Sequence, residues 1–160
     1  MREFKPVSPV FVKSGPIMEN VQTGNKIDLF KFPVPHIAEK DGGRYIGTCD
    51  AIIMKDPDTG RINVGTYRLQ LHGKNTVGIH ASEGKDGRII MDKYHNRGMA
   101  CPVVALVGLD AGIYEASSTY YPHYDGSGEL DWAGWFKGQP EEVIAGKFTG
   151  LPIPAGAEIG

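Results

Sequence analysis

The sequence has few of the features that mark a secreted, membrane-spanning or nucleic-acid-binding protein. Only two cysteines are present, Cys49 and Cys101, which excludes a disulfide-rich framework and favours reduced thiols in a cytoplasmic protein over a single disulfide. No apolar run approaches the roughly 18 residues that span a bilayer, and the N-terminus lacks the apolar core of a signal peptide. The 17 basic and 19 acidic residues form no block of like charge, so we expect no nucleic-acid and no membrane partner.

Glycine and proline, by contrast, are abundant, with 22 and 11 among the 160 residues. They are spread among apolar runs, which is typical of many turns between short strands and excludes a helical bundle or a coiled coil. We therefore predict a mainly β, α+β fold with two or three short helices. The prolines and glycines of residues 1–43 predict an extended lead-in that covers a single domain formed by residues 44–160.

The clearest local signal is a β-hairpin. The runs Arg44–Met54 and Ile62–His72 both favour strands, and Asp56–Gly60 joins them with the residues typical of a turn. Because side chains alternate along a strand, one face of the second run carries a polar row, which consists of Arg68, Gln70 and His72. This row is either a solvated face or the wall of a ligand-binding groove, and the sequence leaves both interpretations open.

The remaining apolar runs predict three further strands, a final strand fragment and the short helices. We expect the strands at Thr76–Ser82, Pro102–Gly108 and Val143–Phe148, with a last one opening near Ala157. We expect the helices at Ile89–Asn96, from a cap at Asp110 to about Ser118, and at Leu130–Lys137. The connections include a turn at Glu83–Gly87 and a loop at Tyr120–Gly128.

Standard phosphate-loop, paired-cysteine, metalloprotease and nucleophile-elbow motifs are absent, but five other stretches follow one another in a characteristic order. They are DGGRYIG at 41–47, NVGTYRLQ at 63–70, PVVA at 102–105, ELDWAGW at 129–135 and PIPAGAEI at 152–159. In this order and spacing they resemble the UbiD family of reversible (de)carboxylases, which use prenylated flavin mononucleotide (prenylated FMN). The resemblance extends from about Val10 to Ile159.

The resemblance implies a split β-barrel like the FMN-binding barrels of flavin reductases. It implies prenylated FMN or FMN as cofactor, with Mn²⁺ or Mg²⁺ at its phosphate and K⁺ as a further candidate ion. The expected ligands of the divalent ion are Asn63, Asp86 and Glu129, where Asp86 stands at a position that carries histidine in close relatives. The expected cofactor-binding residues are Asn63, Arg68, Gln70, Lys85, Tyr121, Pro122 and Glu129, with Lys74 and Tyr120 as further candidates.

The resemblance also implies a substrate and a catalytic pair. Arg68 matches an arginine that holds the carboxylate of an aromatic or α,β-unsaturated acid, and Glu158 matches the first of two glutamates beside it. The second glutamate would lie beyond Gly160. Family members are much longer, with a C-terminal domain that generally covers the active site and forms the dimer. We therefore expect a truncated chain, a separate C-terminal-type subunit or a homo-oligomer.

Several alternatives stay open at the level of the residues and of the function. Asn63 could be a residue at the edge of a turn, Glu129 an acid favoured at a helix start, and Glu158 a solvated strand residue. The leading hypothesis is a UbiD-like decarboxylase domain, with the activity of the isolated chain left open. The alternatives are a non-catalytic flavin-binding module or subunit that needs a partner, and an ordinary flavin oxidoreductase with unmodified flavin.

Overall fold

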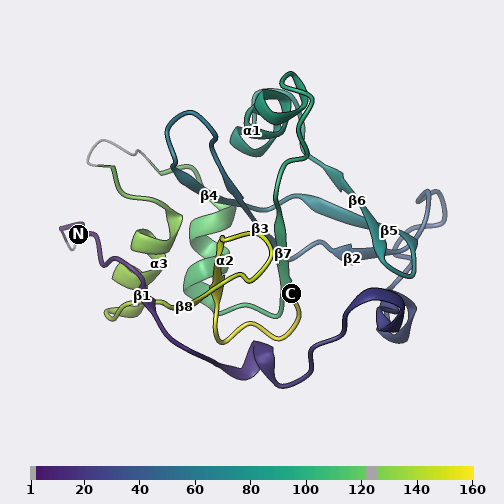
Figure 1. Ribbon diagram of the computed structural model, residues 1–160, viewed down its shortest axis with the longest axis horizontal. Helices are drawn as coiled ribbons and strands as arrows, with labels where there is room; N and C mark the ends of the chain where they lie inside the picture. Colours follow the sequence, from purple (N-terminus) through teal and green to yellow (C-terminus); the bar gives the residue numbers. More distant parts are fainter. Residues whose placement is uncertain (1–2, 122–125) are drawn as a thin grey trace.

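The computed structural model describes residues 3–121 and 126–160, which form nine short strands and three α-helices in these ranges (Figure 1). The strands are β1 Val10–Phe11, β2 Tyr45–Gly47, β3 Asp50–Lys55, β4 Ile62–Gly65, β5 Arg68–Gly73, β6 Thr76–His80, β7 Val104–Val107, β8 Glu142–Ala145 and β9 Pro152–Pro154. The helices are α1 Asp86–His95, α2 Ala111–Ser118 and α3 Glu129–Lys137, and short 3-10 helices lie at Pro16–Met18, Gly24–Lys26 and Leu29–Lys31.

The strands form three sheets of three strands, with the orders β1-β8-β9, β2-β5-β6 and β4-β3-β7. Short strands between frequent turns confirm the α+β class that the glycine and proline content predicted. None of the sheets closes on itself within the described ranges, so the structure does not confirm the expected barrel. It is a sheet-rich α+β fold.

The predicted hairpin is present in its central part. Strands β3 and β4 pair antiparallel, with Ile53 opposite Val64. The turn between them is held by Asp56, whose Oδ1 accepts a hydrogen bond of 2.8 Å from the amide of Asp58. Gly60 then adopts φ +76°, a left-handed conformation that favours glycine. The local residue types were therefore sufficient to predict this turn.

Both predicted hairpin runs are nevertheless broken into two strands, and their outer halves pair in another sheet as β2 and β5. The second run breaks at Thr66, whose amide donates to the carbonyl of Ser117 at 3.1 Å. Its hydroxyl donates to the carbonyl of Asp50, also at 3.1 Å. Beyond the break, β5 shows the predicted alternation, with Leu69 and Leu71 buried.

Strand β3 separates two hydrophobic clusters because both of its faces are buried. Ala51 and Ile53 belong to a cluster that includes residues of α2 and α3. Ile52 and Met54 belong to a second cluster, which includes residues of β5 and α1. All four side chains are fully buried, as the unbroken apolar run of β3 favours.

The helices agree with the sequence prediction except at their starts. Helix α2 is capped by Asp110, whose side chain accepts from the amide of Gly112 at 2.8 Å. Helix α3 begins at Glu129, one residue earlier than predicted, and α1 begins at Asp86, three residues earlier. The early start of α1 places the amide of Gly87 2.9 Å from the hydroxyl of Tyr67, to which it donates. Gly87 and Tyr67 are 20 residues apart in the chain, so the local sequence, with its glycines, predicted a turn at Glu83–Gly87 and could not predict this contact.

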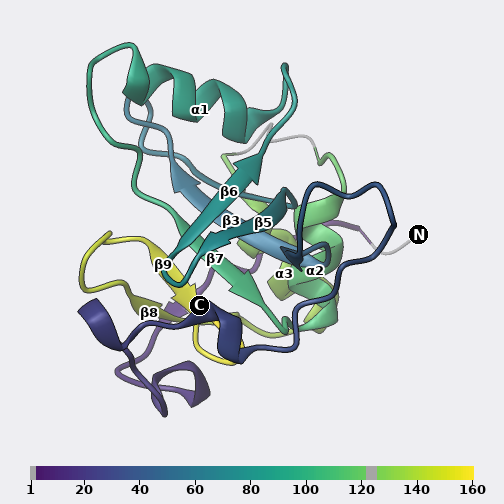
Figure 2. The same ribbon diagram turned by 90° about the vertical axis from the view of Figure 1, so that its right-hand side faces the viewer.

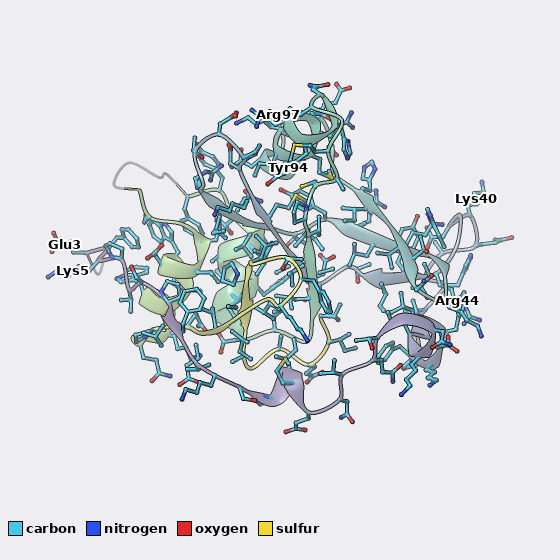
Figure 3. The ribbon with its side chains drawn as sticks, in the orientation of Figure 1. Glu3, Lys5, Lys40, Arg44, Tyr94 and Arg97 are labelled. Carbon is cyan, nitrogen blue, oxygen red and sulfur yellow. The ribbon has the colours of Figure 1, made fainter. Side chains whose placement is uncertain are left out.

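The lead-in runs along the side of the molecule opposite α1 (Figures 1 and 2). Glu3 and Lys5, near the start of the lead-in, lie at the opposite end of the molecule from Lys40, near its end, and from Arg44, which follows it (Figure 3). Strand β1 joins the lead-in to the rest of the fold by parallel pairing with β8.

The C-terminal segment differs from the prediction. Its strand is β9, Pro152–Pro154, whereas a strand had been expected to open near Ala157. Beyond β9, only Ile159 pairs, in a single antiparallel bridge with Val107. Strand β8 ends at Ala145, before the predicted Phe148, because the amide of Gly146 donates to the carbonyl of Leu151 at 2.8 Å and closes a turn.

Cys49 and Cys101 are both free, as predicted, and Cys49 is exposed. Burial raises the pKa of the Cys101 thiol, which lowers the fraction of reactive thiolate at neutral pH. Across the described ranges, no helix is both long and apolar enough to cross a membrane.

Candidate cofactor site

Five of the residues predicted to bind a cofactor or metal line one cavity of about 210 Å³, which we call the β4 hollow. It lies at the meeting point of β4, the start of α1, the end of α2 and the start of α3. Its predicted polar residues are Asn63, Lys85, Asp86, Tyr121 and Glu129. These side chains come from segments up to 66 residues apart in the chain, so only the fold brings them together.

Asn63 and Glu129 are the most buried polar residues of the β4 hollow. Asn63 is 2% exposed and lies inside β4, which argues against a role at the edge of a turn. Glu129 is 7% exposed and is the first residue of α3. Its Oε2 accepts a 3.1 Å hydrogen bond from the amide of Val64, so this helix-start acid also reaches β4.

Tyr67 forms a buried part of the same hollow, and the sequence analysis did not identify it as a site residue. A Cβ on Gly65 or on Gly87 would lie 2.6 Å from an atom of the tyrosine, so both glycines make room for its ring. Burial raises the pKa of the Tyr67 hydroxyl, which keeps this group a neutral hydrogen-bond partner. The sequence offered one sign of this packing: Gly65 stands two positions before Tyr67, where strand alternation would put the small glycine and the large ring on the same face.

Asp86 already has a cationic partner. Its Oδ2 accepts a 2.9 Å hydrogen bond from Nη2 of Arg61, which the sequence analysis did not consider. Arg61 directly precedes β4, two residues before Asn63. Arg61 lines a neighbouring cavity, which shares Val64 and Glu129 with the β4 hollow.

The expected metal ligands offer oxygen atoms of the kind that Mn²⁺ and Mg²⁺ accept. As placed, however, Asp86 is paired with Arg61 and Glu129 is bonded to the backbone of β4. Among the described residues, no group of three or more His, Cys, Asp or Glu side chains is placed so that it could hold a metal ion. The three residues share a hollow but do not form a ready metal centre.

Arg68 and Gln70 lie elsewhere, in a cavity of about 250 Å³ on the sheet β2-β5-β6. His72, His80 and Tyr45 complete its polar wall, and the guanidinium carbon of Arg68 is 6.0 Å from the centroid of the Tyr45 ring. Arg68 and His72 are exposed. The polar row of β5 is therefore solvated and also forms the wall of a shallow groove.

The structure does not bring the predicted catalytic pair together. Glu158 lies against Gly108 and lines another cavity, of about 650 Å³, with Lys137 and Glu141, whereas Arg68 lines the cavity on β5. Burial raises the pKa of Glu141 in the cavity that Glu158 lines, with Lys137 acting in the opposite direction. The roles of Arg68 and Glu158 stay predictions.

The last candidates come from the turn after β5 and from the loop after α2. Lys74 is exposed and its Nζ lies 3.9 Å from Asp28, outside the β4 hollow. Tyr121 stacks on Trp132, with ring centroids 4.3 Å apart. Tyr120 lines the β4 hollow while remaining 84% exposed, and Pro122 lies outside the described residues.

Comparison with known families and proteins gives a consistent result. The model of a family described as "UbiD: 3-octaprenyl-4-hydroxybenzoate carboxy-lyase Rift-related domain" matches residues 10–159. A pyrrole-2-carboxylic acid decarboxylase of Pseudomonas aeruginosa is 32% identical over 155 residues, which are 97% of this chain and 31% of that protein. A phenolic acid decarboxylase of Bacillus subtilis is 34% identical over 151 residues, or 92% of this chain and 31% of that protein.

Solved structures are similar over the same part of the chain. The UbiD-class enzyme HmfF from Pelotomaculum thermopropionicum, solved as an evolved dimeric form in complex with prFMN, superposes with a TM-score of 0.87 and 29% identity. The match covers 96% of this chain and 35% of that one. Vanillic acid decarboxylase of Sedimentibacter hydroxybenzoicus gives a TM-score of 0.85 and 30% identity, covering 95% and 33%. The chain thus spans about a third of the length of these relatives.

Proposed function

Because the chain belongs to the UbiD family, whose model covers residues 10–159, we propose that it is the flavin-binding part of a decarboxylase. Its cofactor is prenylated FMN or FMN, and its substrate is an aromatic or α,β-unsaturated carboxylic acid. The curated relatives named above are decarboxylases of such acids, and a solved neighbour is described in complex with prFMN.

The observation that carries the proposal is the β4 hollow. Five residues that the family resemblance assigns to cofactor or metal binding converge there from β4, α1, α3 and the loop after α2. Asn63, Lys85 and Tyr121 offer donors to a phosphate or to flavin oxygens. In the finer form of the proposal, residues 44–160 form a split barrel around the flavin and residues 1–43 cover it.

In this proposal, Arg68 binds the substrate carboxylate, because a guanidinium presents two parallel donors to the two carboxylate oxygens. Glu158 returns a proton to the product carbon once additional protein brings it near the substrate. Prenylated FMN, when bound, supplies the electron sink for the bond that breaks as CO₂ leaves.

A second candidate function is a flavin-binding module that is completed by a partner protein. Two observations favour it: the chain spans about a third of its relatives, and Arg68 and Glu158 line separate cavities. In this reading the chain binds the cofactor, while a C-terminal-type subunit or a second copy supplies the covering part of the active site.

Reconstitution of the purified chain separates these functions. We expect added prenylated FMN to stay bound through gel filtration and to give the protein its visible absorption. Release of CO₂ from aromatic acids by the chain alone would support the decarboxylase, and binding without release would support the module. Reduction of bound FMN by a nicotinamide cofactor would instead indicate an ordinary flavin oxidoreductase, and a chain that binds no flavin would contradict all three.

The variant Asn63→Ala tests the site itself. Loss of a buried donor to the phosphate is expected to weaken flavin binding about tenfold or more, as measured by quenching of flavin fluorescence. Asn20→Ala, an exposed asparagine of the lead-in, is the matched control and should leave the Kd unchanged. An unchanged Kd for Asn63→Ala would remove the β4 hollow from the proposal.

A further inference from the structure

Arg61 lines the cavity that shares Glu129 and Val64 with the β4 hollow, and it pairs with Asp86 of that hollow. We propose that Arg61 supplies, from the protein itself, the positive charge that holds the cofactor phosphate, so that this chain binds its flavin without a divalent ion. The proposal rests on the proposed function, because it concerns the phosphate of the same cofactor.

The first support is the kind of atom left without a partner. Nη1 of Arg61 is buried and has no hydrogen-bond partner in the described part of the chain. This atom is a donor, directly before β4. What it lacks is an acceptor such as a phosphate oxygen, whereas a metal ion would require further acceptor atoms.

The second support is the engagement of Asp86. One guanidinium nitrogen of Arg61 lies 2.9 Å from Oδ2 of Asp86, and the other is the unpaired Nη1. Asp86 therefore orients the Arg61 guanidinium through Nη2 and leaves Nη1 available to a ligand. Asp86 acts in this arrangement as a positioning residue for Arg61 rather than as a metal ligand.

The third support is the balance of charge around the two cavities. Arg61 and Lys85 offset Asp86 and Glu129, so the site is neutral without any added ion. The α1 helix starts at Asp86, and its partial positive N-terminal end adds attraction for an anion. Arginine also matches phosphate with two parallel donors, which lysine cannot do.

The test measures the Kd of FMN for the whole chain by fluorescence quenching, once in EDTA and once with Mn²⁺. For the unmodified chain we expect binding in EDTA and a change of less than about twofold on adding Mn²⁺. Arg61→Gln should weaken FMN binding in EDTA about tenfold or more, the size expected for a charge-assisted hydrogen bond. It should leave the Kd of riboflavin, which has no phosphate, unchanged.

Two further variants complete the test. Arg88→Gln removes an Arg–Asp pair of the same 2.9 Å length on the exposed side of α1, and should change neither Kd. Asp86→Asn should keep or tighten FMN binding in EDTA, whereas a metal ligand at this position would make the same variant bind more weakly. Far-UV circular dichroism confirms that each variant is folded.

Three outcomes would overturn the inference: Mn²⁺ is required for FMN binding by the unmodified chain, Arg61→Gln leaves the Kd in EDTA unchanged, or it weakens riboflavin binding equally. In each of these cases flavin still binds, so the proposed function stands. If the unmodified chain binds neither FMN nor prenylated FMN with or without Mn²⁺, the proposed function and the inference fail together.

Discussion

Asp50 is the most unusual single residue of the core. Its side chain has no exposed surface. Gly47 makes room for it, because a Cβ on Gly47 would collide with Oδ2 of Asp50. Burial raises the pKa of Asp50 to about 7 from an ordinary value of 3.8, so the folded state favours the neutral acid.

This shift predicts how stability depends on pH. The unfolded chain releases the Asp50 proton near pH 3.8 and the folded chain near pH 7, so the free energy of unfolding should fall as pH rises between these values. The total effect is at most about 4 kcal/mol. Asp50→Asn should flatten this dependence, as measured by urea unfolding at several pH values.

Glu39→Gln is the control for Asp50→Asn, because Glu39 is exposed in the lead-in. It should reproduce the pH dependence of the unmodified chain. A slope for Asp50→Asn equal to that of the unmodified chain between pH 4 and 7 would show that the Asp50 carboxyl is not buried as described.

At the scale of elements, α1 is fastened to the β3–β4 turn by a small charge network. Nζ of Lys93 lies 2.7 Å from Oδ2 of Asp56 and 3.1 Å from Oδ2 of Asp58. The hydroxyl of Tyr94 donates to the carbonyl of Lys55 at 3.1 Å. Arg97 pairs with Asp58 at the end of the helix, where Tyr94 and Arg97 are labelled in Figure 3.

Asp56→Asn should loosen the last turns of α1, because it removes the carboxylate that binds Lys93. The hydrogen bond from Lys93 lowers the pKa of Asp56. The contribution of Asp56 is therefore present above its unfolded pKa and is lost as pH falls through the folded value. We expect amide exchange at the end of α1 to become about two- to fivefold faster near neutral pH.

The control for this prediction is Asp92→Asn, which removes the exposed Arg88–Asp92 pair of the same helix. Hydrogen exchange measured by NMR should show no change at the end of α1 for this variant. Equal acceleration in both variants would mean that the contact with the β3–β4 turn does not hold the helix.

The elements also show where sequence reasoning succeeds and where it stops. The β3–β4 turn was predictable because Asp56 and Gly60 fix it within a few residues. The break after β4 was not, because the partners of Thr66 are Ser117 and Asp50, at separations of 51 and 16 residues. A strand pattern carries no information about such partners.

The same limit applies to the site. The resemblance grouped Asn63, Asp86 and Glu129 as expected metal ligands, and all three line one hollow; a family motif can group residues that lie far apart in the chain because relatives share the fold. It did not predict the pairing of Arg61 with Asp86, which requires β4 and the start of α1 to be adjacent. Nor did it predict the burial of Tyr67, which depends on Gly87 in α1.

At the scale of the whole molecule, the start of the lead-in is fixed to α3 by aromatic stacking. The rings of Phe4 and Trp132 lie 3.6 Å apart at 10°, and Tyr121 also stacks on Trp132. The hydroxyl of Ser8 donates to Oδ1 of Asp131 at 2.7 Å. These contacts join the first residues of the chain to a helix more than 120 positions later.

Phe4→Ala should therefore lower the free energy of unfolding by about 1–2 kcal/mol and shift tryptophan emission to longer wavelength as Trp132 gains contact with water. Denaturation followed by tryptophan fluorescence measures both effects. Phe148→Ala is the control, because Phe148 is 85% exposed. A variant at Phe4 that matches this control in both readouts would show that the lead-in is not fastened there.

Because both faces of β3 are buried, its pairing register with the neighbouring strands β4 and β7 must be set by the residues at its ends. A strand with one polar face that slips by one residue exposes its apolar side chains and is penalised at once. Residues 51–54 offer no such polarity, so a slipped β3 would still bury four apolar side chains. The residues at the two ends of β3 distinguish the correct register from a slipped one. In a slipped register, Asp50 would leave the space beside Gly47, and Lys55 would move from solvent towards the core. Asp50 and Lys55, the two polar residues at its ends, therefore fix the alignment of a strand whose two faces are otherwise both apolar.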